Sequence, residues 1–159
     1  MKPRADYRTL SAPSLDALYA LGKSLANTAL GHTIVELVKI RASQMNGCLF
    51  CLDMHVKEAK IHGERELRIH HVPLWRESPL FSAKEKAALQ WTELLTRPGP
   101  QGVEDKDYAE VSAHFSEKDV SDLTLVIVMI NAWNRLGIAF RSTPGALDKA
   151  MGLDKAGLH

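Results

Sequence analysis

Hydrophobic side chains recur at helical spacing along most of the chain, whereas the apolar–polar alternation typical of β-strands is missing. A first helix is predicted to begin after Pro13, with Ser14 as its N-cap and its leucines on one face. A second helix is predicted over residues 32–45, and Asn46-Gly47 then breaks the pattern. The first part of the chain is therefore expected to be helical.

The same periodicity continues to the end of the chain. A third helix is predicted over residues 48–62, where Gly63 supplies a C-cap, and Ser82 with Glu85 forms the sequence pattern of a capping box. Further helices are expected over residues 64–71, 82–96, 105–114 and 117–140. In the last of these, Leu123–Ile130 is apolar all round, which predicts burial on every side. The fold class expected is an all-α helical bundle.

Length and composition limit the classes of protein. The chain has 159 residues, so we expect a single domain over residues 1–159. Its 20 Lys and Arg are balanced by 19 Asp and Glu, so no nucleic-acid partner is expected. The N-terminus, MKPRADYRTL, lacks the apolar core of a secretory signal, which favours a cytoplasmic protein. The segment Leu123–Ile130 is far shorter than the roughly 20 residues that cross a bilayer, so no membrane partner is expected.

The two cysteines of the chain lie three positions apart, in Cys48-Leu-Phe-Cys51. In a reducing compartment this spacing favours redox chemistry or metal binding over a structural disulfide. On a helix, Cys48, Cys51 and His55 fall within about 60° of arc. Cα atoms three residues apart on a helix are about 5 Å from each other, inside the range that a disulfide can bridge. The pair can therefore close without unfolding the helix.

The order of the two sulfurs in a reaction depends on two arguments. The first turn of a helix favours a thiolate, because its unpaired N–H groups carry partial positive charge, and this favours Cys48. His55 lies four residues beyond Cys51, within side-chain reach, but seven beyond Cys48, which is too far. We give the histidine more weight and predict that Cys51 attacks and Cys48 resolves.

Other uses of a cysteine pair are also considered. A c-type haem needs a histidine directly after the second cysteine, where this chain has Leu52, and a thioredoxin-like site needs a βαβ context. Zinc could take Cys48, Cys51 and His55 as ligands, with a fourth from His62 or a distant histidine. No metal is expected, but a metal-binding module stays open as an alternative.

The segment from Glu36 to His55, ELVKIRASQMNGCLFCLDMH, resembles the core motif of the alkylhydroperoxidase AhpD-like family, within the carboxymuconolactone decarboxylase superfamily. The resemblance covers most of the chain from about residue 30 to 145, including the late segment NAWNRLG. It implies the all-α AhpD-like fold and assembly as a homo-oligomer, a trimer or a hexamer.

The resemblance changes the interpretation of Glu36. Taken alone, Glu36 is an ordinary acid in the first turn of a helix, paired with Lys39. The resemblance implies that His55 moves protons between the two thiols and that Glu36 completes this relay through a water molecule.

The resemblance also implies roles for the sulfurs. Cys51 would be the peroxidatic thiolate and Cys48 the resolving thiol of an enzyme that reduces hydroperoxides. Family peroxidases carry a histidine just before the second cysteine, where this chain has Phe50. Decarboxylase members generally lack the cysteine pair, so its presence argues against lactone decarboxylation here.

The expected reaction needs no bound cofactor. A hydroperoxide is the expected substrate, and an external dithiol or a lipoylated protein is the expected reductant. The alternatives are a thiol–disulfide oxidoreductase or redox sensor of the same family, and a decarboxylase that retains the thiols.

Overall fold

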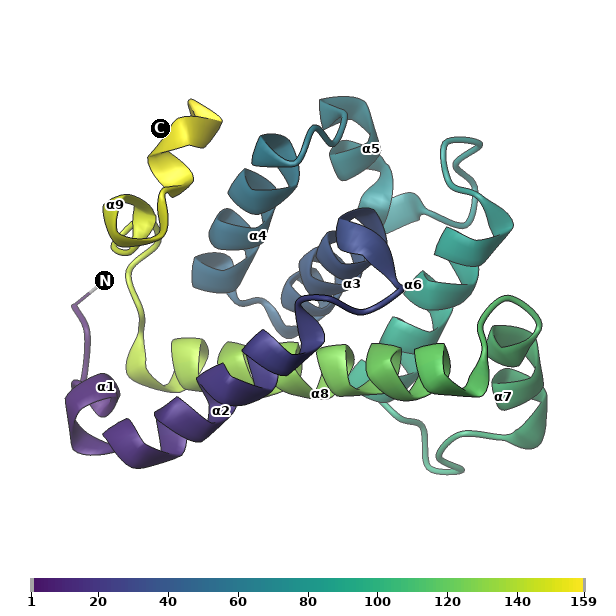
Figure 1. Cartoon of the computed structure of the whole chain (residues 1–159), viewed down its shortest axis with the longest axis horizontal. Helices are drawn as coiled ribbons and strands as arrows, with labels where there is room; N and C mark the ends of the chain where they lie inside the picture. The colour runs from purple at the N-terminus through teal and green to yellow at the C-terminus, as the bar shows by residue number, and fades with distance from the viewer. Residues whose placement is uncertain (1, 159) are drawn as a thin grey trace.

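The computed structural model describes residues 2–158, and these residues form helices and turns without a β-strand (Figure 1). The helical segments are α1 (Tyr7–Leu10), α2 (Ala12–Leu25), α3 (Gly31–Asn46), α4 (Leu49–Ile61), α5 (Glu66–His71), η1 (Val72–Leu74), α6 (Ala83–Thr96), α7 (Asp105–Ser112), α8 (Glu117–Phe140), α9 (Asp148–Met151) and η2 (Leu153–Ala156). The predicted all-α class is confirmed.

The central helix of the fold is α3. It packs against α4, α6 and α8, and its residues Val38, Ile40 and Ala42 have no exposed surface. Figure 1 shows α2 crossing α8, and these two helices pack against each other. Because α4 and α8 both rest on α3, residues far apart in the sequence meet at the junction of these three helices.

Helix starts follow the capping rules where the sequence provides a side-chain cap. The capping box of Ser82 and Glu85 is present at the start of α6. The hydroxyl of Ser116 accepts a hydrogen bond from the backbone N–H of Asp119 at the start of α8. Both helices have the predicted ends.

The start of α2 differs from the prediction. The helix begins at Ala12, because Pro13 lies in its first turn, where a missing N–H leaves no helical hydrogen bond unmade. Ser14 is therefore inside the helix, and the prediction that it caps α2 is wrong.

The predicted burial of α8 on every side is also wrong. Leu125 is 39% exposed and Val128 is 54% exposed, because α2, α3 and α6 cover only the other sides of the helix. In residues 2–158, α8 is also the one helix long and apolar enough to cross a bilayer by length and composition, with 39% of its apolar window buried in the fold. The core helix of a soluble protein meets the same criterion, so this observation is weak evidence for a membrane.

The short helices at the ends of the chain were not predicted. α1, α9 and η2 are each four residues long, too short to show a periodic pattern. Tertiary contacts hold them in place. The Tyr7 ring of α1 stacks on Phe140 at a centroid distance of 4.9 Å, and Lys57 of α4 pairs with Asp148 of α9 at 2.7 Å. α1 and α9 are thus fixed near the end of α8 and along α4.

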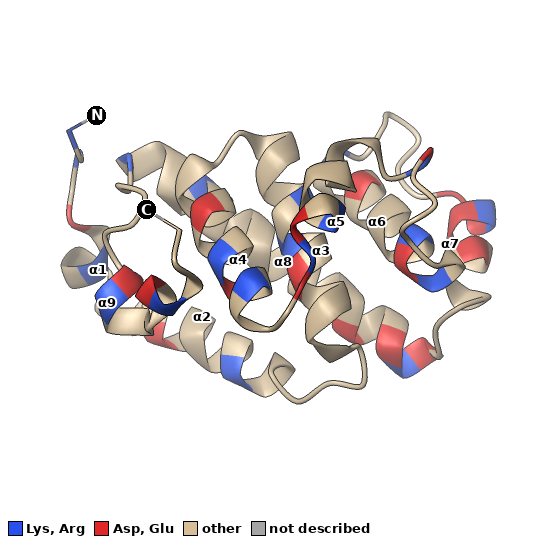
Figure 2. Cartoon of the chain, turned by 90° about the horizontal axis from the view of Figure 1, so that it is seen from above, with Lys and Arg blue, Asp and Glu red and all other residues tan. Residues whose placement is uncertain are grey.

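Charged residues of both signs are intermingled along the helices. Figure 2 shows blue and red segments side by side on most elements in this view, rather than one sign gathered over one face. This distribution agrees with the nearly balanced composition of the chain.

Candidate dithiol site

The cysteine pair lies at the turn between α3 and α4. Gly47 ends α3 in the left-handed region, with φ of 69°, which glycine adopts without strain. Cys48 follows as the N-cap of α4 in an extended conformation, and its backbone N–H donates to the Ser43 carbonyl at 3.0 Å. Cys51 lies in the first turn of α4. The helix was predicted to include Cys48, which instead flanks it.

Both sulfurs lie against α8 at Gly137. A Cβ atom at position 137 would be 3.0 Å from Cys48 Sγ and 3.7 Å from Cys51 Sγ. Both cysteines are free and almost fully buried, with 2% and 3% of their surface exposed. Glycine therefore provides the space in which the two sulfurs lie side by side.

The two thiols differ in pKa. A hydrogen bond from the Cys51 thiol lowers the pKa of Cys48 to about 7, and the nearby Asn134 and His55 act in the same direction. The hydrogen bond to Cys48 and burial both raise the pKa of Cys51. The first thiolate is therefore favoured on Cys48, as the helix-end argument from the sequence indicated.

His55 lines the same cavity as Cys51 and is held by two carboxylates. Its Nδ1 is 3.1 Å from Glu36 Oε2 and 2.7 Å from Glu58 Oε2. Burial alone would lower the pKa of His55, but the hydrogen bonds to Glu36 and Glu58 raise it above its usual value. The contact between His55 and Glu36 is direct. The prediction, implied by the resemblance, that a water molecule joins Glu36 to the relay is therefore wrong for this contact.

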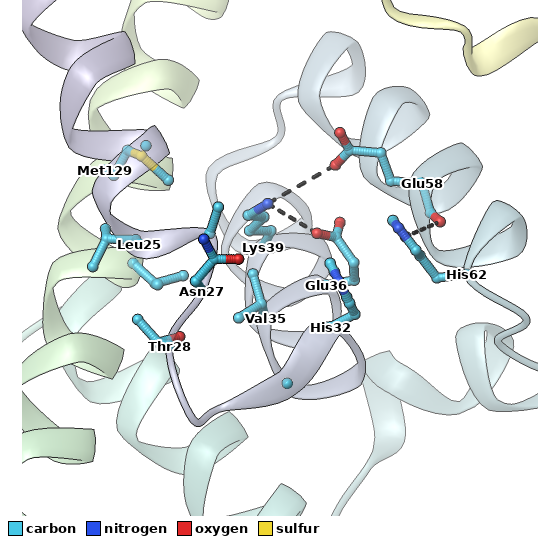
Figure 3. Close-up of a pocket in the computed structure, with 14 residues that line it drawn as sticks. Leu25, Asn27, Thr28, His32, Val35, Glu36, Lys39, Glu58, His62 and Met129 are labelled. Atoms are coloured by element: carbon cyan, nitrogen blue, oxygen red, sulfur yellow. Dashed lines mark hydrogen bonds and ion pairs between the residues drawn. The ribbon is translucent and has the colours of Figure 1, made fainter.

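Lys39 balances the charge of the two carboxylates. Its Nζ donates to Glu36 Oε1 at 2.9 Å and lies 3.9 Å from Glu58 Oε2, as the dashed lines in Figure 3 show. Burial alone would raise the pKa of Glu36, but His55 and Lys39 lower it to about 2. Glu36 is therefore ionised at neutral pH.

The groups that could share a metal ion differ from those expected. In residues 2–158, the donor atoms that lie within 4.8 Å of one another belong to Glu36, His55 and Glu58, not to the cysteines. Because the Lys39 ammonium group already lies between the two carboxylates, a cation there would have to displace it. The zinc site formed by Cys48, Cys51 and His55 is not assembled in this arrangement.

Two cavities meet at this network. One, here called the sulfur-side cavity, has a volume of about 720 Å³ and includes Cys51 and His55 in its lining, but not Cys48. The other, here called the carboxylate-side cavity, has a volume of about 440 Å³ and includes Glu36 (Figure 3). Lys39 and Glu58 line both cavities. The His55 network therefore separates the two spaces.

The lining of the two cavities differs in character. The apolar residues of the sulfur-side cavity include Leu18, Phe50, Met54, Met129, Ile130, Trp133 and Leu147. The carboxylate-side cavity is lined by the apolar Leu25, Val35, Val126 and Met129, but it has a larger share of polar lining, which includes Asn27, Thr28, His32 and His62. The two histidine rings stack at 4.3 Å.

The structure brings all four predicted site residues into one region, but three further residues were missed. Glu58 follows His55 by three positions on α4, so its i, i+3 spacing is a signal that could have identified it. Asn134 is fully buried and comes from α8, and Arg8 comes from α1. Neither Asn134 nor Arg8 lies at a spacing that relates it to the cysteine motif.

The all-helical fold, the two buried thiols and the imidazole–carboxylate network together define this chain as a helical thiol protein. The chain is a member of the carboxymuconolactone decarboxylase family, whose model matches residues 13–94, and it shares the AhpD-like fold of that superfamily.

Two known proteins illustrate this membership. The uncharacterized protein YdfG of Bacillus subtilis is 39% identical over 139 residues, which are 87% of this chain and 95% of YdfG. A structure from Agrobacterium tumefaciens, described as a protein of unknown function and a candidate antioxidant defence protein AhpD, has a TM-score of 0.86 at 37% identity. That match covers 91% of this chain and 99% of the other.

The debrominase Bmp8 is more distant, with a TM-score of 0.76 at 20% identity over 92% of this chain and 78% of Bmp8. At this identity the likeness shows the fold alone. Since one fold can support different reactions, the activity has to be inferred from the site.

Proposed function

We propose that this protein is a thiol-dependent peroxidase that reduces organic hydroperoxides with the Cys48–Cys51 pair. The observation that carries the proposal is that both sulfurs lie against Gly137 of α8, and that Cys51 lines a cavity that His55 also lines. A dithiol that can lose one proton near neutral pH has the nucleophile and the resolving group that peroxide reduction requires.

The first step is attack by Cys51. The lower pKa belongs to Cys48, but Cys51 lines the sulfur-side cavity and Cys48 does not. Access decides between them, because the nucleophile has to touch the peroxide. Transfer of the Cys51 proton to Cys48 puts the thiolate on Cys51. This thiolate attacks one oxygen of the O–O bond, which breaks to leave a sulfenic acid on Cys51 and an alkoxide.

His55 supplies the proton that the alkoxide needs. Its raised pKa favours the imidazolium form, and its Nδ1 is held by Glu36 and Glu58, which leaves Nε2 as the nitrogen for the substrate. A positioned acid of this kind is typical of general acid catalysis. The alcohol product then leaves through the sulfur-side cavity.

Cys48 completes the reaction. Its sulfur attacks the sulfenic acid of Cys51, a disulfide forms and water leaves. Gly137 leaves room for both sulfurs during this step. An external dithiol, free or on a lipoylated protein, then reduces the disulfide by exchange. In total, one hydroperoxide and two external thiol groups give an alcohol, water and a new external disulfide.

The carboxylate-side cavity gives water access to the carboxylates that hold His55. Glu36 and Glu58 contact His55 Nδ1 and also line this cavity, which is the more polar of the two (Figure 3). Nδ1 keeps its proton against these carboxylates while Nε2 gives its proton to the alkoxide, so Nε2 regains a proton from solvent before the next turnover. Glu36 and Glu58 act in this scheme as positioning residues for His55.

The same proposal includes the cellular setting. A reaction that depends on a reducing dithiol fits the cytoplasm, where thiols are kept reduced. The apolar outer face of α8, with Leu125 and Val128 exposed, fits a homo-oligomer in which a second copy of the chain covers this face. Light scattering of the wild type and of Val128→Asp tests this, and a monomeric wild type would contradict it.

Steady-state peroxide consumption tests the proposed activity. Reduced protein, cumene hydroperoxide and excess dihydrolipoamide are mixed, and the wild type is compared with Cys51→Ser. Turnover by the wild type that the variant lacks is the expected result. Oxidation of the dithiol by disulfides but not by peroxide would instead indicate a thiol–disulfide oxidoreductase.

Two further measurements separate the remaining alternatives. Stoichiometric zinc in freshly purified protein would favour a metal-binding module. Lactone turnover that survives in a Cys48→Ser/Cys51→Ser double variant would favour a decarboxylase.

A further inference from the structure

Arg8 brings an unpartnered positive charge to the sulfur-side cavity. Its side chain lines this cavity and forms no hydrogen bond or ion pair with residues 2–158, and its Nε is buried without a partner. A buried donor of a charged group that is left unsatisfied costs free energy, so such groups usually have a partner. The missing partner is therefore expected to be a bound anion.

The fold holds Arg8 in this position. Its guanidinium carbon lies 5.0 Å from the centroid of the Tyr7 ring and 5.6 Å from that of Phe50, which is the neighbour of Cys51. The Tyr7 ring is buried against Phe140, and the backbone N–H of Arg4 donates to the Phe140 carbonyl at 3.0 Å. α1 is thus tied to the end of α8, and Arg8 is ordered between two aromatic rings.

The other charged residues of the cavity do not replace this partner. Asp16 and Lys23 line it but are exposed to solvent. Lys39, Glu58 and His55 already pair with one another or with Glu36. Arg8 is therefore the half-buried cation of this cavity that remains available for a ligand.

We propose that Arg8 binds the carboxylate of the substrate, and that the substrate is an amphipathic carboxylic acid whose apolar body fills the sulfur-side cavity. A guanidinium group can bind a carboxylate through two parallel hydrogen bonds. The volume of about 720 Å³ and the apolar lining suit a ligand of this kind. For catalysis this rests on the proposed peroxidase function, since the acid would carry the hydroperoxide that reaches Cys51.

Ligand binding without a peroxide tests this inference separately from the activity. Calorimetric titration of reduced protein compares decanoate with decan-1-ol, which has the same chain length and no charge. We expect decanoate to bind the wild type at least about 10-fold more tightly, as a charge-assisted pair allows. Arg8→Gln should remove this preference and leave the affinity for decan-1-ol unchanged, and Arg8→Lys should keep only part of it.

Lys23→Gln is the matched control, because it removes an exposed charge from the same cavity. It should change the affinity for decanoate by less than about twofold, as expected for a solvated charge. A thermal unfolding curve shows whether each variant is folded. Equal affinity of the wild type for both ligands, no binding of decanoate, or an equal loss in Arg8→Gln and Lys23→Gln would overturn the inference.

The two proposals can fail independently. If decanoate binds through Arg8 but the protein consumes no hydroperoxide, the peroxidase proposal falls and the carboxylate site stands. If peroxide is consumed but a fatty acid hydroperoxide and its methyl ester react equally fast, the activity stands and Arg8 has no role in choosing the substrate.

Discussion

The two cavities beside the His55 network differ in polarity, and this difference suggests which cavity holds the substrate and which holds water. The sulfur-side cavity is larger and mostly apolar, and it includes Cys51. The carboxylate-side cavity is smaller and has a larger share of polar lining, including Glu36, although Leu25 and Val35 also line it (Figure 3). A peroxide and an apolar substrate suit the first space, and water and protons suit the second. His55 is hydrogen-bonded to the carboxylates of the carboxylate-side cavity and lines the sulfur-side cavity. Its imidazole ring would therefore deliver the proton next to the sulfur that reduces the peroxide.

The largest expected effect comes from removing the nucleophile on the apolar side. Cys51→Ser should abolish peroxide consumption, because a serine hydroxyl is a far weaker nucleophile than a thiolate near neutral pH. Cys48→Ser is the matched variant. It should still react once with peroxide and then stop at the sulfenic acid, because no second thiol can resolve it. Trapping with dimedone and mass spectrometry distinguishes these outcomes.

The next effect concerns the group between the two cavities. His55→Gln should lower the rate of Cys51 oxidation by about 10²–10⁴-fold, the usual contribution of a positioned general acid. Stopped-flow measurement with a hydroperoxide whose alcohol is a poor leaving group should show the full loss. If the rate changes by less than threefold, His55 does not deliver the proton.

A smaller effect is expected on the polar side, and it is best measured as a pH profile. The carboxylate of Glu36 raises the pKa of His55, so the imidazolium form and the rate are lost only when pH rises through that raised pKa. Glu36→Gln should shift this alkaline limb to lower pH, and a shift of one unit gives about a 10-fold loss of rate at a pH above both pKa values of His55. Thiol ionisation limits the rate on the acid side, near the pKa of about 7 at Cys48.

Glu58→Gln is the comparison for Glu36→Gln. Glu58 is more exposed than Glu36, with 23% against 6% of the side chain accessible, so water can replace part of its contact with His55. The shift of the alkaline limb should therefore be in the same direction and smaller. An unchanged profile in both variants would show that the carboxylates do not control His55.

The smallest expected effect on stability is at Gly137. Alanine in a helix interior is favoured over glycine by about 1 kcal/mol, but its Cβ would lie 3.0 Å from Cys48 Sγ. The two contributions oppose each other, so Gly137→Ala should change the free energy of unfolding by less than about 1 kcal/mol. Disulfide formation should nevertheless slow, because the Cys48 sulfur has to move. Urea unfolding and the rate of thiol loss measure these two effects.

Much of the fold was predictable because long helices carry local signals. The ends of α6 and α8 follow from the serine caps at Ser82 and Ser116, which act through hydrogen bonds to residues three positions away. The error at Pro13 came from treating proline as a boundary, although it also fits the first turn of a helix. The exposed side of α8 could not be predicted, because an all-apolar pattern does not show how many neighbours surround a helix.

For the site as well, only residues close together in the sequence could be predicted to lie together. Cys48, Cys51 and His55 lie on one short segment, so their spacing places them together. The contact of His55 with Glu36 depends on how α3 packs against α4, which only the family resemblance indicated. Arg8 reaches the cavity through the docking of a four-residue helix on α8. No local pattern in the sequence encodes that contact.

Single-turnover oxidation of the reduced protein measures the proposed chemistry most directly. One equivalent of cumene hydroperoxide is added, and the intact mass and the alcohol product are determined. We expect the protein to lose about 2 Da as Cys48 and Cys51 join, with an equal amount of cumyl alcohol released. An unchanged mass with the peroxide intact, or alcohol formed equally by the double serine variant, would contradict the proposed role of the pair.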